Sequence, residues 1–168
     1  EQATHAFGYG LSVTALQLAQ SYAVLAADGV RRPVSLLKLE SAPAGQRVMR
    51  ATTARSVRRM LETVVSDEGT AKRAGVPGYR VAGKTGTVRK SIAGGYSEDR
   101  YHALFAGMIP ASRPRLVMVV LLDEPRGDDY YGGLVAAPVF ARVMSGAMRL
   151  LNVKPDQLPQ PGARVARL

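Results

Sequence analysis

Three stretches of the chain place apolar residues at the three- and four-residue spacing of an α-helix. The first stretch begins after Thr14, which forms a capping box with Gln17, and it ends before Gly29. The second is capped by Thr52 or Thr53 and ends before Gly69. We expect their apolar faces to lie in the core: Leu16, Ala19, Tyr22, Ala23 and Ala26 in the first, and Val57, Met60, Leu61, Val64 and Val65 in the second.

The third stretch begins at Pro138, which suits the first turn of a helix. We expect this helix to pack against a sheet, because its apolar stripe is the strongest in the chain. The stripe consists of Val139, Phe140, Val143, Met144, Ala147, Met148 and Leu151.

Strand-like runs occupy residues 79–88, 101–109 and 116–122, and the last two are joined through the turn residues 110–114. The pattern predicts three antiparallel neighbours and an α+β fold with helices packed on the sheet. Polar or glycine-rich segments at 41–46, 91–100 and 123–133 are interpreted as linkers. Residues 1–152 then form one domain, and residues 153–168 form a proline-rich basic tail.

Composition narrows the possible functions only slightly. A chain of 168 residues that is 46% hydrophobic is long enough for one core, and no apolar run approaches the roughly 20 residues that span a bilayer. The absence of cysteine excludes disulfides and thiolate metal sites, and neither His5 nor His102 has the spacing of a metal ligand, so we expect no metal and no cofactor. The net charge of +10 would attract polyanions, but the basic residues are scattered and we expect no nucleic acid partner.

The most informative residues are Lys84, Thr85, Gly86 and Thr87, which lie within the first strand-like run. Because side chains alternate along a strand, Thr85 and Thr87 face one side and Lys84 and Gly86 the other. Two hydroxyls about 7 Å apart beside a cation can hold a carboxylate. Gly86 allows a close approach of a neighbouring element, and at a sheet edge the Thr87 N–H could stabilise an oxyanion. On this motif alone, an ordinary strand end with a glycine bulge is an equal alternative.

Lys-Thr-Gly is one of three motifs of the penicillin-recognising serine enzymes. Over nearly its whole length the chain resembles the class B penicillin-binding proteins, in particular their division-specific transpeptidases. The resemblance therefore implies the penicillin-binding transpeptidase fold. The segments that carry it are Phe7–Leu18, Arg32–Ser35, Gly78–Thr87, Phe105–Ala111 and Tyr130–Phe140.

The other two motifs of that family are not found. Ser35 and Lys38 match Ser-x-x-Lys, but Pro33 and the alternating pattern around Ser35 predict a strand, which would separate the two side chains. The only asparagine is Asn152, so no Ser-x-Asn exists. We therefore expect the C-terminal half of a transpeptidase domain, incomplete and inactive without an upstream segment that carries the nucleophilic serine and the membrane anchor.

The resemblance implies an enzyme that cross-links D-Ala-D-Ala stem peptides of peptidoglycan in septal wall synthesis and is a target of β-lactams. By motif, Lys84 and Thr87 would be catalytic, and Thr85, Gly86 and Thr87 would bind substrate. The matches at Arg89, for added charge, and at Tyr101, Tyr130, Tyr131 and Gly133, for an aromatic wall in a glycine-edged loop, are looser. A solvated arginine and tyrosines that merely pack stay open as alternatives.

The resemblance also implies partners and a location. The partners would be the upstream half-domain, peptidoglycan stem peptides, β-lactams and membrane proteins of the division machinery, including a glycan polymerase. The location would be the periplasmic face of the bacterial inner membrane. Two other readings are a fragment of a serine β-lactamase or D,D-carboxypeptidase, and a non-enzymatic basic binding module.

Overall fold

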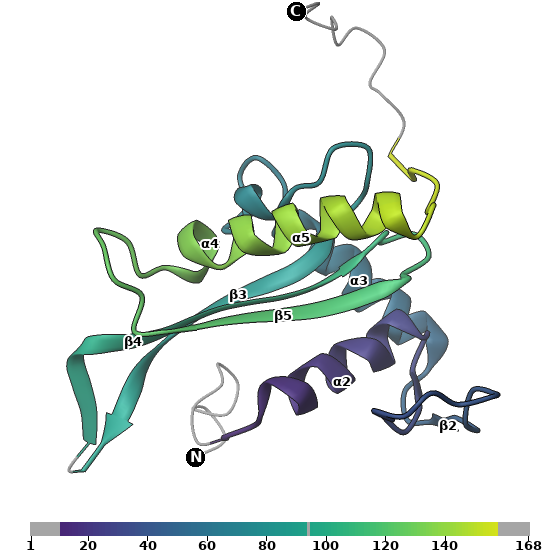
Figure 1. Cartoon of the computed structure of the whole chain (residues 1–168), viewed down its shortest axis with the longest axis horizontal. Helices are drawn as coiled ribbons and strands as arrows, with labels where there is room; N and C mark the ends of the chain where they lie inside the picture. The colour runs from purple at the N-terminus through teal and green to yellow at the C-terminus, as the bar shows by residue number, and fades with distance from the viewer. Residues whose placement is uncertain (1–10, 94, 158–168) are drawn as a thin grey trace, which may run out of the picture.

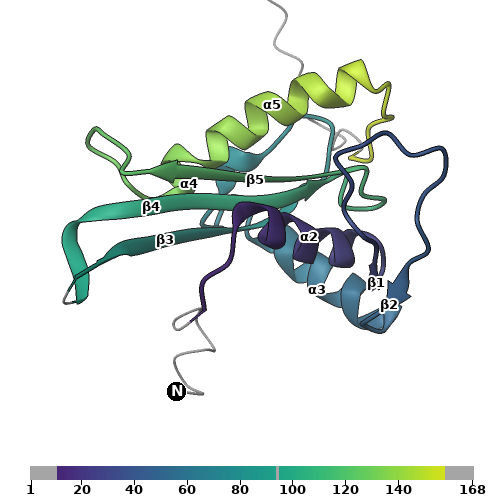
Figure 2. The same ribbon diagram turned by 60° about the horizontal axis from the view of Figure 1, so that its bottom comes forward.

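A three-stranded antiparallel sheet with helices on both faces forms the centre of the computed structural model, which describes residues 11–93 and 95–157 (Figure 1). The strands are β3 (Ala82–Ile92), β4 (Gly95–Ile109) and β5 (Leu116–Asp123), in the order β3-β4-β5. Helices α4 (Gly132–Val135) and α5 (Ala137–Leu150) cover one face, and α2 (Ala15–Ala26) and α3 (Ala51–Thr63) lie against the other (Figure 2). The predicted α+β class and antiparallel neighbours are confirmed.

Helix α2 begins as the capping box predicts. The Gln17 backbone N–H donates to Thr14 Oγ1 at 3.2 Å, and the Thr14 N–H donates to Gln17 Oε1 at 2.8 Å. Shortly after its end, Gly29 adopts a φ of +87°, and a Cβ there would lie 2.2 Å from the Met49 carbonyl oxygen. Glycine is therefore required at this stop. Of the predicted stripe, Tyr22 and Ala26 pack under the sheet, whereas Leu16 and Ala23 are exposed.

The predicted cap of α3 is wrong. The helix begins after Arg50, which is in the extended region and makes no side-chain capping bond, so Thr52 and Thr53 lie inside the first turn. The stripe is also only partly correct, because Met60 is 67% exposed while Leu61 packs under the sheet. Val64 and Val65 follow the helix and pack on the opposite core.

Strands β3 and β4 extend farther than their apolar patterns indicate, so the interpretation of residues 91–100 as a linker is wrong. The ladder pairs Ala82 with Met108 and continues to Arg89 opposite Tyr101. After a shift of register, Ser91 pairs with Tyr96 at the tip of the hairpin (Figure 1). We call residues 91–99 the hairpin arm. The β4–β5 hairpin through residues 110–115 agrees with the prediction.

A small second sheet joins β1 (Val30–Arg31) to β2 (Gln46–Arg47), so the linker predicted at 41–46 ends in a strand residue. The strand expected around Ser35 does not form, because the residues after β1 run as a loop with a bend at 36–37. A strand there would need a partner, and β2 pairs only with Val30 and Arg31.

The core has two parts, one on each face of the sheet. Beneath α5 lie fully buried side chains from the strands and the helix, including Phe105, Ile109, Phe140 and Met148, with the two phenyl rings edge to face at 4.9 Å. Under α2 and α3 lie Ala82, Met108 and Ala111.

Helix α5 has Pro138 in its first turn, as predicted. Its buried face is narrower than its apolar stripe, because Val139, Val143 and Leu151 are exposed. Residues 132–150 are together long and apolar enough to cross a membrane, which the sequence analysis did not expect. Phe140, Met144 and Met148 pack against the sheet, so we interpret this segment as a core helix.

The beginning of the predicted tail is attached to the domain. Val153 packs against the core under α5, and the Asp156 carboxylate accepts from the Arg80 N–H at 2.8 Å and from the Ser112 N–H at 3.1 Å. The ordered part of the chain therefore continues to at least residue 157, and residues 158–168 lie outside the described residues.

Phe140→Ala should lower the free energy of unfolding of the complete domain by about 3–5 kcal/mol, because it removes a fully buried ring and leaves a cavity. Urea unfolding followed by circular dichroism measures this. The neighbouring Val139→Ala is the control, since Val139 is 38% exposed and should cost far less. Equal losses in the two variants would contradict the assigned core.

Candidate functional site

The threonines of the Lys-Thr-Gly-Thr strip face α4, and their hydroxyls are held by neighbouring groups. Thr87 Oγ1 accepts a hydrogen bond from the Gly132 N–H at 3.0 Å. Thr85 Oγ1 lies 3.2 Å from Thr70 Oγ1, on the loop after α3. Both threonines are half-buried. The alternation predicted for the strip is therefore present, with the two hydroxyls on one face.

Glycines allow α4 to approach the sheet at backbone distance. A Cβ on Gly132 would lie 2.2 Å from the Leu104 carbonyl oxygen and 2.6 Å from that of Gly86. A Cβ on Gly133 would lie 2.0 Å from the Thr70 carbonyl oxygen. Gly86 itself faces the Leu104 side chain, at 2.9 Å from a built Cβ. Larger residues at these positions would displace α4 from the strip.

Lys84 is exposed, and its amine curls around the strand edge toward the threonine side. Nζ lies 3.2 Å from both the carbonyl oxygen and Oγ1 of Thr85. An ammonium group therefore adjoins the hydroxyl pair, as a carboxylate site requires.

Strand β3 forms the edge of its sheet. Its only strand partner among residues 11–93 and 95–157 is β4. An edge strand presents backbone N–H groups to a ligand, which is the condition for the predicted oxyanion role of Thr87.

The three predicted tyrosines come together beside the strip. The rings of Tyr101 and Tyr130 stack with centroids 4.2 Å apart, and those of Tyr130 and Tyr131 stack at 4.5 Å. Tyr131 is 54% exposed, so the stack presents an aromatic surface to solvent. The Tyr130 hydroxyl donates to that of Tyr131 at 3.3 Å, and this bond, with the neighbouring phenols, raises the pKa of Tyr130 to about 12.

Arg89 lies opposite Tyr101 in the ladder and two residues beyond Thr87, on the same face. Its side chain is exposed, and it forms no hydrogen bond or ion pair with a described residue. Its guanidinium is thus available to a ligand at the end of the strip.

Ser35 has none of the geometry of a nucleophile. Its hydroxyl donates to the Leu37 carbonyl oxygen at 2.9 Å and accepts from the Leu37 N–H at 3.1 Å, which closes a local turn. No helical turn brings Lys38 beside Ser35, as Ser-x-x-Lys chemistry requires.

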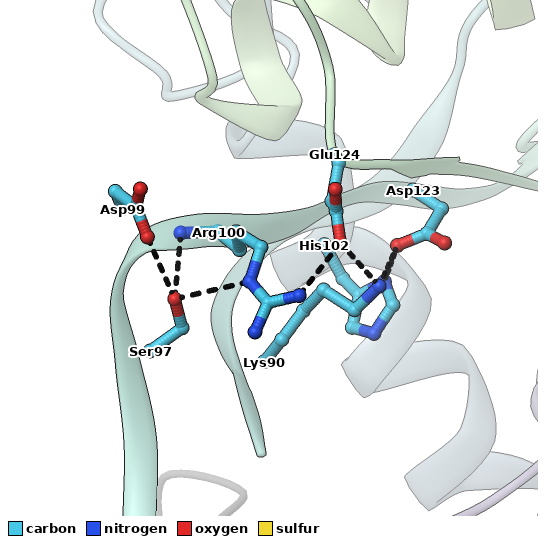
Figure 3. A network of polar contacts seen from close by, with 7 residues as sticks. All are labelled: Lys90, Ser97, Asp99, Arg100, His102, Asp123 and Glu124. Carbon is cyan, nitrogen blue, oxygen red and sulfur yellow. Dashed lines mark hydrogen bonds and ion pairs between the residues drawn. The ribbon is translucent and has the colours of Figure 1, made fainter. Parts of the chain in front are cut away.

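Two residues of this region escape the sequence analysis. Thr70 joins the strip through Thr85, and Lys90 forms ion pairs with Asp123 and Glu124 near the tyrosines (Figure 3). These carboxylates raise the pKa of Lys90, and the Lys90 amine lowers that of Asp123. Their partners are distant in sequence, so no local motif could have indicated either residue.

Comparisons with known proteins agree with this arrangement. Residues 1–145 match the family model of the penicillin binding protein transpeptidase domain. The chain is 46% identical over 157 residues to the probable peptidoglycan D,D-transpeptidase PenA of Neisseria flavescens. The matched region is 94% of this chain and 39% of that protein. It is 44% identical over 158 residues to the peptidoglycan D,D-transpeptidase FtsI of Escherichia coli K12, covering 94% and 27%.

A solved structure gives the same result. The apo transpeptidase domain of penicillin-binding protein 3 from Burkholderia pseudomallei superposes with a TM-score of 0.87 at 48% identity, covering 94% of this chain and 48% of that chain. The fold is thus that of a penicillin-binding protein transpeptidase domain. The chain belongs to the family of penicillin-binding protein transpeptidase domains, which confirms the resemblance. It spans about half of the solved domain and less than half of these curated relatives.

The tyrosine stack should titrate late. The Tyr130 pKa of about 12 lies above the ordinary value of 10.0, so the stability that its neutral phenol contributes is present below pH 10 and is lost as the pH rises toward 12. Ultraviolet titration of tyrosinate should lose its latest transition in Tyr130→Phe. In Tyr131→Phe, which removes the main cause, Tyr130 should titrate earlier. An unchanged titration in both variants would contradict the stacked arrangement.

Proposed function

We propose that the protein containing these residues is a serine-type peptidoglycan D,D-transpeptidase, and that this chain supplies the wall that recognises the substrate. The observation that carries the proposal is the edge strand β3, whose paired threonine hydroxyls and ammonium group are held beside an exposed aromatic stack. The relatives named as D,D-transpeptidases match the chain over this whole region.

In this proposal a serine from the upstream half of the domain attacks the carbonyl carbon of the D-Ala-D-Ala bond. The carbon–nitrogen bond breaks, D-alanine leaves with the proton, and the acyl group then passes from the serine to an amine of a second stem peptide. Water exclusion and a donor for the oxyanion are needed at both steps. A β-lactam enters the same site and acylates the same serine.

The residues of this chain have separate roles in that reaction. Thr85 and Thr87 bind the terminal carboxylate, and Arg89 adds a positive charge at the end of the strip. Lys84 serves the proton network of the upstream Ser-x-Asn serine, and the Thr87 N–H helps to hold the oxyanion. Gly86 and Gly133 keep backbone contacts close. The tyrosine stack, Tyr101, Tyr130 and Tyr131, receives the apolar parts of the ligand.

We further propose that the chain acts only together with the upstream half-domain and is inactive alone. Support comes from the edge of β3, which pairs with no strand other than β4 in the described part of the chain. It also comes from apolar side chains that are about half exposed or more: Leu11, Leu16 and Leu121. Such a surface needs a partner to exclude water. The homologous domain structure is about twice as long as the matching region.

The proposed site of action is the periplasmic face of the bacterial inner membrane, with anchoring outside this chain. Peptidoglycan stem peptides and β-lactams are the proposed ligands, and membrane proteins of the division machinery, including a glycan polymerase, are the proposed partners. Support for a division role comes from the likeness to FtsI and to penicillin-binding protein 3.

Thr87→Val in the complete domain should slow acylation by benzylpenicillin about 10- to 100-fold, because a hydrogen bond to a charged group is lost. Stopped-flow acylation kinetics measure this. Thr87→Ser is the matched control, since it keeps the hydroxyl and should retain most of the rate. Wild-type rates in Thr87→Val would refute the carboxylate role.

Intact-mass spectrometry after exposure to a penicillin should place the adduct on a companion upstream segment, and only when this chain is present. The isolated 168-residue chain should gain no mass. An adduct on this chain itself would support Ser35 as the nucleophile and contradict the proposal that the nucleophilic serine lies in the upstream segment.

A further inference from the structure

A cluster of charged side chains lies at the root of the hairpin arm, with Lys90 at its centre (Figure 3). Lys90 Nζ lies 2.8 Å from Asp123 Oδ1 and 2.7 Å from Glu124 Oε1. Two further cationic or titratable groups face the same carboxylates from β4: Arg100 Nη1 is 3.8 Å from Glu124 Oε1, and His102 Nδ1 is 3.1 Å from Asp123 Oδ1. Lys90 thus links β3 to the end of β5 across β4.

Lys90 stands where the ladder between β3 and β4 is interrupted. Arg89 pairs with Tyr101 and Ser91 with Tyr96, so Lys90 alone spans the interval that residues 97–100 occupy on β4. Side-chain bonds replace the ladder at this point, including one from the buried Ser97 hydroxyl to Asp99 Oδ1 at 2.8 Å. The direction of the arm therefore depends on polar side chains.

The cluster continues into the tyrosine stack. Glu124 has a φ of +48°, an uncommon conformation for a residue other than glycine, and its N–H donates to the Tyr101 carbonyl oxygen at 2.9 Å. The ring of Tyr101 stacks on Tyr130, at the far end of the loop that Glu124 begins. Glu124 is held by its backbone to Tyr101 and by its carboxylate to Lys90.

We propose that Lys90 positions the tyrosine stack, which would bind the side chain of a ligand. By holding Asp123 and Glu124 together, Lys90 fixes the loop that places Tyr130 and Tyr131 against Tyr101. The nature of the ligand in this inference rests on the proposed function. The effect of Lys90 on the position of the tyrosines does not depend on the proposed function. In the described part of the chain the Lys90 amine bonds only to Asp123 and Glu124, so it would act through the tyrosine stack.

The physical reason is charge balance at one point. Two carboxylates converge on a single amine whose side chain is 21% exposed, which reduces screening by solvent. Without the amine the two carboxylates repel each other, with only Arg100 and His102 nearby. Glu124 has a φ of +48° and a side chain that is 41% exposed, so we expect its carboxylate and the loop that it begins to move when the amine is removed.

The test compares two probes in the complete domain: benzylpenicillin, which carries an aromatic side chain, and 6-aminopenicillanic acid, which lacks it. In Lys90→Met the ratio of their acylation rates should fall about three- to tenfold, as expected from losing two partly exposed ion pairs. Glu124→Gln should shift the ratio in the same direction if Lys90→Met does not fold. Lys90→Arg should restore most of it.

Lys72→Met is the matched control, because Lys72 forms a 2.8 Å ion pair with Asp67 in which both side chains are more than half exposed, and this pair includes neither Asp123 nor Glu124. Its ratio should equal that of the wild type. An unchanged ratio in both Lys90→Met and Glu124→Gln would overturn the proposal.

A second readout separates this inference from the proposed function. Loosening of the stack should bring the Tyr130 titration down toward its ordinary range in Lys90→Met but not in Lys72→Met. If neither probe acylates the wild type, the proposed function fails, and the titration alone decides whether Lys90 positions the tyrosines. An unchanged titration would then overturn the inference.

Discussion

The contact between the first turn of α4 and the edge of the sheet is the constraint on which the site depends. Helix α4 begins with two glycines whose Cα atoms lie so close to the carbonyl groups of Gly86, Leu104 and Thr70 that no side chain fits. This contact delivers the Gly132 N–H to the Thr87 hydroxyl, and it sets the tyrosines that precede α4 beside the strip. The threonine pair of the strip and the tyrosine stack are therefore both positioned by one backbone contact.

The contact between α4 and the sheet in turn depends on both parts of the core, one on each face of the sheet. Phe105 and Phe140 hold α5, and with it α4, on one face of β4, while Met108 and Ala111 pack toward α2 and α3 on the other. Asp156 then ties the root of β3 to the turn between β4 and β5 through two backbone N–H groups. Strand β3 is thus fixed at the end remote from the hairpin arm, whereas polar side chains bridge the interruption of the ladder at the root of the arm.

Features whose cause is local in sequence could be predicted, and features made by distant partners could not. The Thr14 capping box and the alternation of Thr85 and Thr87 follow from nearest neighbours and are present. The cap of α3 was misplaced because a threonine is equally acceptable inside the first turn. The hairpin arm was missed because residues 91–99 show no regular alternation of apolar and polar residues and contain two consecutive glycines. Thr70 and Lys90 join the site only through contacts made on folding.

The hydrogen bond from the Gly132 N–H to Thr87 Oγ1 also makes the Thr87 hydroxyl a donor toward a ligand. One lone pair of the Thr87 oxygen accepts the Gly132 N–H, which leaves the hydroxyl hydrogen available to donate to an incoming acceptor. Beside it stand an ammonium and a guanidinium, which can only donate. A surface composed in this way attracts acceptors and repels amines. In the proposed cross-linking reaction, this surface would distinguish the peptide that ends in a carboxylate from the peptide that brings an amine, because it offers only donors and positive charge.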